Sequence, residues 1–295
     1  SSLSANRLTR GHRNAAHPVV SVPAAEDLLD VLDAAGIVAS AQTRREQIVA
    51  AATRLAAEAG GGVDIAGEAR LLDQVTYLVE RPAPLLGRFD ERYLDLPEEV
   101  LTTVMRKHQR YLPVRAASGR LMPFFVAVAN GEIDPDVVRA GNEAVLRARY
   151  DDAAFFYRAD RGTPPQVLRE RLGKLTFTDK LGSMADRADR IAAIALDLAP
   201  AVPLGDDALK TLITAAGVVK FDLASQLVTE MTALAGIMAR NYAGHAGFGD
   251  DVAQALYEAE LPRHTGDDVP AGLAGAVLSL ADRLDLVCGL AATVG

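Results

Sequence analysis

The chain has 295 residues, and its 31 lysines and arginines against 39 aspartates and glutamates give a formal net charge of −8. Hydrophobic residues make up 49% of the sequence, which is enough for packed cores and excludes a disordered chain. No uncharged apolar run reaches the roughly 18 residues of a membrane span, and the N-terminal stretch, with its three arginines, lacks the apolar region of a secretory signal. The length predicts about two domains.

Cysteine and histidine content limits the chemistry that the chain can perform. Cys288 is the only cysteine, which excludes an internal disulfide and a thiolate metal cluster and favours a reducing, cytoplasmic location. Because Cys288 lies in an apolar helical pattern, we expect a buried, inert thiol. The five histidines show no HxxxH or HExxH spacing, and the sequence contains no GxSxG and no Walker A motif. These patterns argue against the commonest hydrolase and phosphate-loop sites.

In chain order, the first half predicts a mixed α+β domain. Strand-like runs occur at 19–22, 111–114 and 121–129, and Ser118-Gly119 between the last two indicates a hairpin. Thr43-Arg-Arg-Glu46 fits a capping box, and Pro97 and Asp134-Pro135 are typical of helix starts. Helical spacing of apolar residues predicts helices over roughly 28–35, 43–59, 71–79, 97–105 and from 134 onward.

The second half predicts an all-α domain, because strand signals mostly vanish after about residue 165. Helical patterns cover 183–198, 209–220, 222–230, 234–243, 252–261 and 273–290. We therefore expect two domains, 1–165 and 166–295. The apolar residues Leu280, Leu284, Val287 and Leu290 share a helix face that runs almost to the last residue, and we expect the chain to be a fragment of a longer protein.

Positive charge is concentrated in one part of this acidic chain. Residues 101–130 contain no aspartate or glutamate. A local cationic face of this kind is what binding to a nucleic-acid backbone requires. The same charges also have structural explanations. They can form a solvated surface balanced by acids folded beside it, or make salt bridges within the protein. Cations are also favoured at the C-terminus of a helix by the helix dipole. The candidate contacts are Arg106, Lys107, His108, Arg110, Arg115, Arg120, Arg147 and Arg149. Helical spacing predicts that Arg106 and Arg110 share one face.

Three blocks carry a resemblance to a known family by their order and spacing. They are 96–114 (LPEEVLTTVMRKHQRYLPV), 125–130 (FVAVAN) continued by 141–156 (GNEAVLRARYDDAAFF), and 180–190 (KLGSMADRADR). Further matching segments lie at 9–13, 222–223, 229–231, 236–238, 261–263 and 281–285. Together they resemble the β subunit of bacterial-type glycyl-tRNA synthetase, over essentially the whole chain.

The resemblance implies an internal part of that subunit, without its N-terminal segment and its C-terminal anticodon-binding part. It also implies a B3/B4-like α+β domain followed by an HD-like helical domain. In the family, the α subunit holds the class II catalytic core and uses ATP and Mg, the β subunit supplies tRNA recognition, and the two form a heterotetramer. We therefore expect tRNA(Gly) and the α subunit as partners, no membrane, and no catalytic residue or cofactor in this chain.

The HD-like position is degenerate in this sequence. HD-type hydrolases bind a metal through an adjacent His-Asp pair, and here Phe221 precedes Asp222, with Asp282 or Asp285 as the later acid. Phenylalanine cannot bind a metal, so we predict no metal site and an ion pair of Lys220 with Asp222 in its place. A metal-dependent HD-type phosphohydrolase is the alternative function. Editing of mischarged tRNA is a third, for which no catalytic pair is evident.

Overall fold

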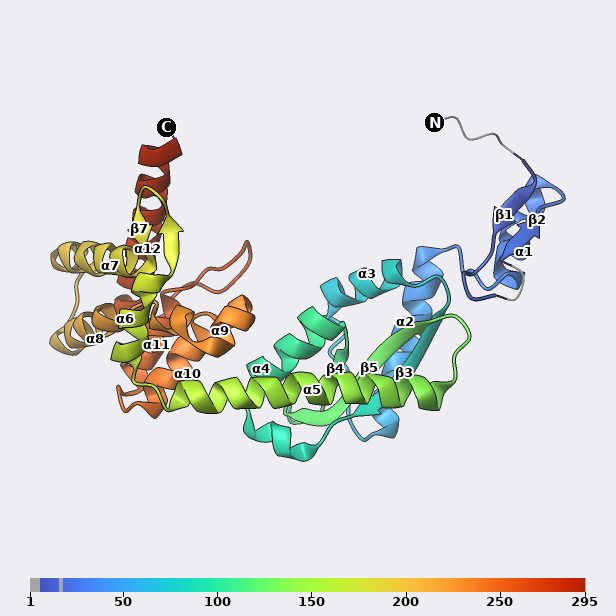
Figure 1. The fold of residues 1–295 in the computed structure, drawn as a ribbon, viewed down its shortest axis with the longest axis horizontal. Helices are drawn as coiled ribbons and strands as arrows, with labels where there is room; N and C mark the ends of the chain where they lie inside the picture. The colour runs from blue at the N-terminus through green and yellow to red at the C-terminus, as the bar shows by residue number, and fades with distance from the viewer. Residues whose placement is uncertain (1–5, 16–17, 295) are drawn as a thin grey trace. The chain divides into compact units, whose positions relative to one another are not determined.

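The computed structural model describes residues 6–15 and 18–294 and divides into two compact units, Ser1–Asp152 and Ala153–Gly295 (Figure 1). This division lies inside helix α5, Pro135–Arg161, whereas the sequence analysis places the boundary after residue 165. Apolar residues continue along this helix without a turn signal, so the sequence offers no visible break at the division. In the part of the chain that is described, no helix is long and apolar enough to cross a membrane.

The first unit is built around a three-stranded antiparallel sheet with the strand order β3-β5-β4. The predicted hairpin is confirmed: β4 pairs with β5 across the turn that contains Ser118-Gly119, and Gly119 has the positive φ of 84° that such a turn favours. Strand β3 was not expected, because Pro82 and Pro84 argue against a strand. β3 is an edge strand, where a missing N–H costs no ladder hydrogen bond. The bounds are β3 Pro82–Arg88, β4 Leu112–Arg115 and β5 Leu121–Asn130.

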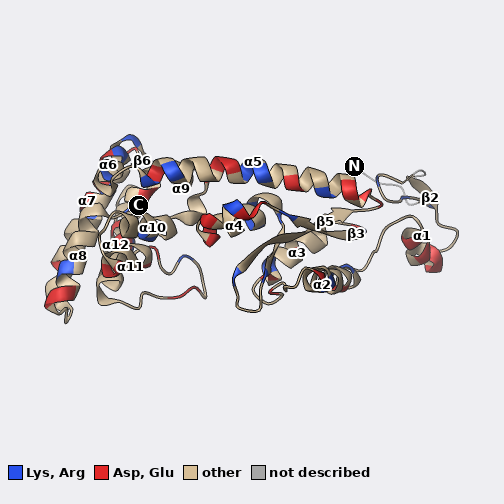
Figure 2. Ribbon diagram, turned by 90° about the horizontal axis from the view of Figure 1, so that it is seen from below, with Lys and Arg blue, Asp and Glu red and all other residues tan. Residues whose placement is uncertain are grey.

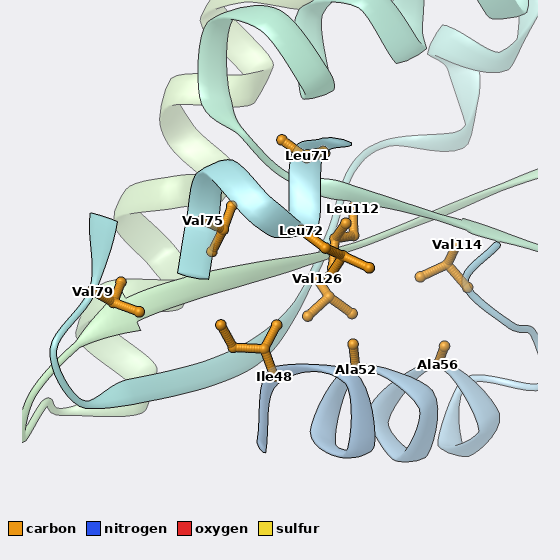
Figure 3. Close-up of a cluster of buried hydrophobic side chains, with 10 residues drawn as sticks. All are labelled: Ile48, Ala52, Ala56, Leu71, Leu72, Val75, Val79, Leu112, Val114 and Val126. Carbon is orange, nitrogen blue, oxygen red and sulfur yellow. The ribbon is translucent and has the colours of Figure 1, made fainter. Parts of the chain in front are cut away.

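Helices α2 and α3 cover one face of this sheet and close the hydrophobic core drawn in Figure 3. Ile48, Ala52 and Ala56 recur at intervals of four on α2 and face Leu72 and the sheet. The core holds ten buried residues: Ile48, Ala52, Ala56, Leu71, Leu72, Val75, Val79, Leu112, Val114 and Val126. The helices are α2 Ala41–Glu58 and α3 Ala69–Leu78.

The start of α2 differs from the expected capping box. Ser40 is the N-cap, and its hydroxyl accepts a hydrogen bond from the Thr43 N–H at 3.2 Å. Thr43 therefore lies in the first turn, and Glu46 receives a hydrogen bond from Gln42. The prediction was wrong by one helical turn, since serine caps a helix as well as threonine does.

The remaining elements of the first unit flank the core. Tyr150 of α5 donates a hydrogen bond to the Leu101 carbonyl at 3.2 Å, and its ring meets Phe89 edge-on. A small hairpin pairs Thr9 with Val20 and precedes helix α1. The bounds are β1 Leu8–Arg10, β2 Val19–Ser21, η1 Ala25–Asp27, α1 Leu28–Ala34, η2 Glu91–Asp95, α4 Glu98–Thr103 and the π-helical turn η3 Val104–Gln109.

The second unit is mainly helical, as predicted, but it also contains a short hairpin in which Thr176 of β6 pairs with Ser183 of β7. An all-α description was therefore wrong at this point; two- and three-residue strands are too short to produce an alternating pattern. The elements are α6 Pro165–Arg171, η4 Leu172–Lys174, β6 Thr176–Thr178, β7 Gly182–Ser183, α7 Met184–Leu198, η5 Ala199–Ala201, α8 Asp206–Val218, η6 Phe221–Ala224, α9 Gln226–Glu230, η7 Thr232–Leu234, α10 Ile237–His245, α11 Asp250–Glu258 and α12 Leu273–Val294.

Two predictions about the second unit need correction. The single helix expected over 222–230 is broken at Ser225, whose hydroxyl accepts from the Val228 N–H and starts α9 as a separate helix. Cys288 is exposed rather than buried. It lies on the outer side of α12, where Leu284 and Val287 are exposed as well. Apolar neighbours in sequence therefore did not indicate burial on this helix.

Candidate nucleic-acid interface

The cationic segment of the first unit begins where α4 ends. α4 passes into the π-helical turn η3, and Arg110 ends that turn in the left-handed region with φ 57°. The Tyr111 N–H then donates to the Met105 carbonyl at 2.9 Å, which closes the turn. The dipole of a helical C-terminus favours cations, and Lys107 and His108 lie there with exposed side chains.

Arg106 does not share a free face with Arg110. Its Nε donates to Oε1 of Glu68 at 2.8 Å, and Glu68 is only 4% exposed. The expected α-helical spacing fails because residues 104–109 form a π-helical turn and Arg110 is left-handed. Arg106 therefore neutralises a buried carboxylate just before α3, which no local pattern could reveal because the two residues are 38 positions apart.

Arg115 also has a partner within the protein. Its Nη1 lies 2.6 Å from Oε1 of Glu98 and donates to the Gly119 carbonyl at 2.7 Å. The Arg115 side chain is 25% exposed, so it braces the hairpin turn against the start of α4. Arg106 and Arg115, two of the eight candidate contacts, thus form salt bridges within the protein. Such internal pairing was one of the alternatives that the sequence left open.

The other six candidates are exposed: Lys107, His108, Arg110, Arg120, Arg147 and Arg149. Within residues 6–15 and 18–294, none of them has an ion-pair partner, so their charge is available to a ligand. Lys107, His108 and Arg110 lie within the four positions 107–110, at and just after the end of η3, and are called the cationic turn below. Arg120 lies in the β4–β5 connection, just before β5 begins.

The two arginines of α5 have a mixed electrostatic setting. Figure 2 shows acidic and basic residues alternating along this helix. Arg147 lines a pocket of about 470 Å³ together with Arg88 and the acid Glu143, which accepts a hydrogen bond from the Arg88 N–H at 2.9 Å. Arg88 was not among the expected contacts, because it lies at the end of β3, a strand that the sequence patterns did not predict. Acidic side chains therefore lie closer to the candidate arginines of α5 than to the cationic turn, which belongs to an acid-free stretch of the sequence.

Aromatic residues near the cationic turn belong to the core. Tyr111 is 6% exposed and its ring stacks on Phe125 with centroids 4.6 Å apart. Burial raises the pKa of Tyr111 to about 12, so its hydroxyl stays protonated at neutral pH. These rings fix the position of the turn and are not available to a nucleobase.

The residues expected at an HD-like position lie in and beside a network of buried ion pairs in the second unit. Lys220 Nζ lies 2.6 Å from Glu260 Oε1 and 3.0 Å from Asp282 Oδ2. The predicted ion pair between Lys220 and Asp222 is wrong: Lys220 pairs with Glu260 and Asp282, and Asp222 is not an ion-pair partner of Lys220. Burial alone would lower the pKa of Lys220, but the carboxylates of Glu260 and Asp282 raise it above its ordinary value, so the ammonium stays charged.

Arginines extend this network on the other side. Arg187 Nη2 lies 2.8 Å from Asp282 Oδ1, and Arg190 pairs with Asp285. Asp282 and Asp285, the two possible later acids, thus both have cationic partners. A Lys ammonium and a guanidinium occupy the carboxylate oxygens that a divalent cation would need. The described residues contain no group of three or more histidine, cysteine or acidic side chains arranged to hold a metal.

Asp222 is isolated within the same region. It is fully buried and accepts from the Gly236 N–H at 2.8 Å, and its Oδ1 has no hydrogen-bond partner in the described part of the chain. Burial, with the charge of Glu260 nearby, raises the pKa of Asp222 to about 7. Phe221, at the position of the missing histidine, is also fully buried.

Comparisons with known proteins agree with the motifs. The family model of the glycyl-tRNA synthetase beta subunit matches residues 1–294. The glycine–tRNA ligase beta subunits of Marinobacter nauticus and Synechocystis sp. are 44% and 42% identical over 96% and 98% of this chain. A chloroplastic/mitochondrial glycine–tRNA ligase of Arabidopsis thaliana is 43% identical over 98% of the chain. The chain spans 40% of the two bacterial relatives and 27% of the plant one. By the extent and consistency of these matches, the chain belongs to the glycyl-tRNA synthetase beta subunit family.

Proposed function

We propose that this chain is the part of a glycyl-tRNA synthetase beta subunit that binds tRNA(Gly) and supports ligation of glycine to it by an α subunit, which supplies the ATP- and Mg-dependent chemistry. The observation that carries the proposal is the cationic turn. Lys107, His108 and Arg110 are exposed and have no ion-pair partner in the described structure, in an acid-free stretch of a chain with net charge −8.

Charge of this kind is suited to phosphates. Arginine presents a planar fork of donors that matches a phosphate, and lysine adds a mobile point charge. Because the chain as a whole has a net charge of −8, RNA is attracted to local positive charge and repelled by the acidic surface, which restricts the orientation of the bound molecule. Membership of a tRNA ligase family supports tRNA as the polyanion.

The proposal extends to the architecture and the partners. The first unit would correspond to a B3/B4-like domain and the second to a degenerate HD-like domain, with the chain working in a heterotetramer in the cytoplasm. The alternative, a metal-dependent phosphohydrolase, is disfavoured because Lys220 and Arg187 hold the acids that would bind a metal. No observation favours an editing site.

Binding of tRNA(Gly) by this chain as a function of salt concentration tests the proposal. We expect Lys107→Glu with Arg110→Glu to raise the Kd at least about tenfold and to reduce the slope of log K against log salt by about 1.4 to 1.8, since each lost phosphate contact removes about 0.7 to 0.9. The matched control is Arg54→Glu with Lys210→Glu, which makes the same charge change at exposed residues outside the segment.

The outcomes separate a local contact from a general charge effect. Equal weakening by both pairs of substitutions would show that only net charge matters. Unchanged binding by the Lys107 and Arg110 variant, with an unchanged melting temperature, would remove the cationic turn from the interface and leave the proposal without its support.

A further inference from the structure

The N-terminal hairpin is a second cationic element that the proposed function does not use. The first 25 residues contain Arg7, Arg10 and Arg13 and no aspartate or glutamate. All three arginines are exposed, and none has an ion-pair partner among residues 6–15 and 18–294. They lie within seven consecutive residues on and beside β1, which pairs with β2; Figure 1 shows both strands beside α1. Their charge is therefore uncompensated and open to solvent.

A pocket of about 520 Å³ lies at the base of this hairpin. Its polar lining comes from Asn14, Ser21, Arg81 and Glu132, and Val31 and Ala34 of α1 add apolar surface. Pockets of roughly 300 to 1,000 Å³ with a mostly apolar wall and a few polar groups are typical of small-molecule sites. The volume and the mixed lining suit a ligand the size of one nucleotide.

His12 forms the inner wall of the pocket and is 5% exposed. Its backbone N–H donates to the Ala35 carbonyl at 2.8 Å, and its ring packs against Gly131, where a Cβ would lie 2.3 Å from Cε1. Nδ1 accepts from the Asn14 N–H at 3.3 Å, which assigns the proton of a neutral ring to Nε2. His12 is thus held by backbone contacts on both sides.

The Nε2 of His12 has no hydrogen-bond partner in the described part of the chain. A buried donor without an acceptor is unfavourable, so a bound molecule that brings an oxygen acceptor gains at this position. Arg81, on the same pocket, adds a guanidinium. An anionic ligand with several acceptor oxygens fits both groups.

We propose that the β1–β2 hairpin and the pocket at its base form a second RNA contact. The three arginines bind backbone phosphates, and the pocket receives one unpaired nucleotide whose oxygens pair with His12 Nε2 and Arg81. This inference rests on the proposed function, because it takes tRNA as the ligand. Protein recognition of RNA targets unpaired nucleotides that leave the stack, which is the form a pocket of this size can hold.

Three variants of the whole chain test the inference in tRNA(Gly) binding across salt concentrations. The hairpin variant carries Arg7→Ala, Arg10→Ala and Arg13→Ala. The turn variant carries Lys107→Ala and Arg110→Ala. The control carries Arg45→Ala, Arg54→Ala and Lys210→Ala, which removes the same charge as the hairpin variant from residues that already have carboxylate partners.

We expect the hairpin variant to lose affinity about tenfold or more and to reduce the salt slope by about 2 to 3, while the control changes little. If the turn variant weakens binding and the hairpin variant does not, the second contact is refuted and the proposed function stands. If the hairpin variant alone weakens binding, the second contact stands and the cationic turn is refuted. If neither does, both fail.

A substitution in the pocket tests nucleotide binding there separately from the arginines of the hairpin. Ala34→Phe fills it without removing a charge, because Ala34 lies on its wall with an exposed side chain. We expect this variant to weaken tRNA binding severalfold at an unchanged salt slope and an unchanged melting temperature. Ala57→Phe, at an exposed position of α2, is the matched control. Wild-type affinity in Ala34→Phe would refute nucleotide binding in the pocket.

Discussion

Arg110 and Lys220 are the two non-glycine residues with positive φ in the described part of the chain, at 57° and 65°. A left-handed conformation costs an ordinary residue about 1–2 kcal/mol relative to glycine, so it persists where the side chain has a role. Lys220 uses it to place its ammonium between Glu260 and Asp282. Arg110 has no such internal partner in the described structure, which is consistent with a role toward an external ligand.

The substitution Arg110→Gly separates the backbone conformation of this residue from the charge of its side chain. Because glycine adopts the left-handed conformation without strain, we expect the free energy of unfolding to rise by about 0.5–1 kcal/mol. The same substitution removes a charge from the cationic turn and should weaken tRNA(Gly) binding severalfold. Chemical denaturation and binding measured on one preparation check both effects. Arg120→Ala is the control: it should weaken binding without the gain in stability, and a stabilised Arg110→Gly that binds normally would contradict the assignment.

Asp222 gives the second unit a pH dependence with a defined sign. Its pKa is about 7 in the folded chain and about 3.9 when unfolded, so the folded state keeps a proton that the unfolded chain releases. Its contribution to stability therefore becomes more unfavourable as the pH rises from about 4 to 7, by about 4 kcal/mol in total.

The neutral variant Asp222→Asn checks this sign. The free energy of unfolding of this variant should fall less than that of the wild type between about pH 5 and pH 8, because an amide at position 222 does not ionise over this range. Asp207→Asn, at a fully exposed carboxylate, should follow the wild type over the same range. Parallel pH profiles for Asp222→Asn and the wild type would show that Asp222 ionises at its ordinary pKa.

At the scale of elements, the sequence predicted those helices and strands whose apolar residues repeat with a regular period. Helices α2, α3, α7, α8 and α12 and the β4–β5 hairpin occur near their expected positions. β3 was missed because prolines are tolerated on an edge strand, and the cap of α2 was misplaced because two hydroxyl residues lie within one turn. The acidic partners of Arg106 and Arg115 are brought close by the tertiary fold. The sequence could therefore locate the cationic segment, but it could not show which of its arginines form salt bridges within the protein.

Helix α3 offers a matched pair that tests the role of its buried face. Leu72 is fully buried in the core of Figure 3, whereas Leu78, on the same helix, is 60% exposed. We expect Leu72→Ala to lower the free energy of unfolding by about 2–5 kcal/mol and Leu78→Ala by less than about 1 kcal/mol. Urea denaturation measures both. Similar losses for the two variants would mean that the core does not stabilise this helix as described.

At the scale of the whole molecule, each unit has its own buried residues. The first has the core around Leu72, and the second buries Leu212 on α8 completely. The charges are divided as well: the exposed cations considered for RNA binding all lie in the first unit, while the buried ion-pair network lies in the second. We therefore expect substitutions in the ion-pair network of the second unit to change stability without removing a cation considered for RNA binding.

Separate cores predict two unfolding transitions. We expect Leu72→Ala to speed hydrogen exchange at protected amides of the first unit and to leave those of the second near wild-type rates, because compact units with their own cores can open independently. Leu212→Ala should do the reverse. Hydrogen-exchange mass spectrometry resolves peptides from each unit, and peptides from α5, which crosses the division, report which unit governs that helix. Equal acceleration throughout the chain by either substitution would show a single cooperative unit and would contradict the division at Asp152.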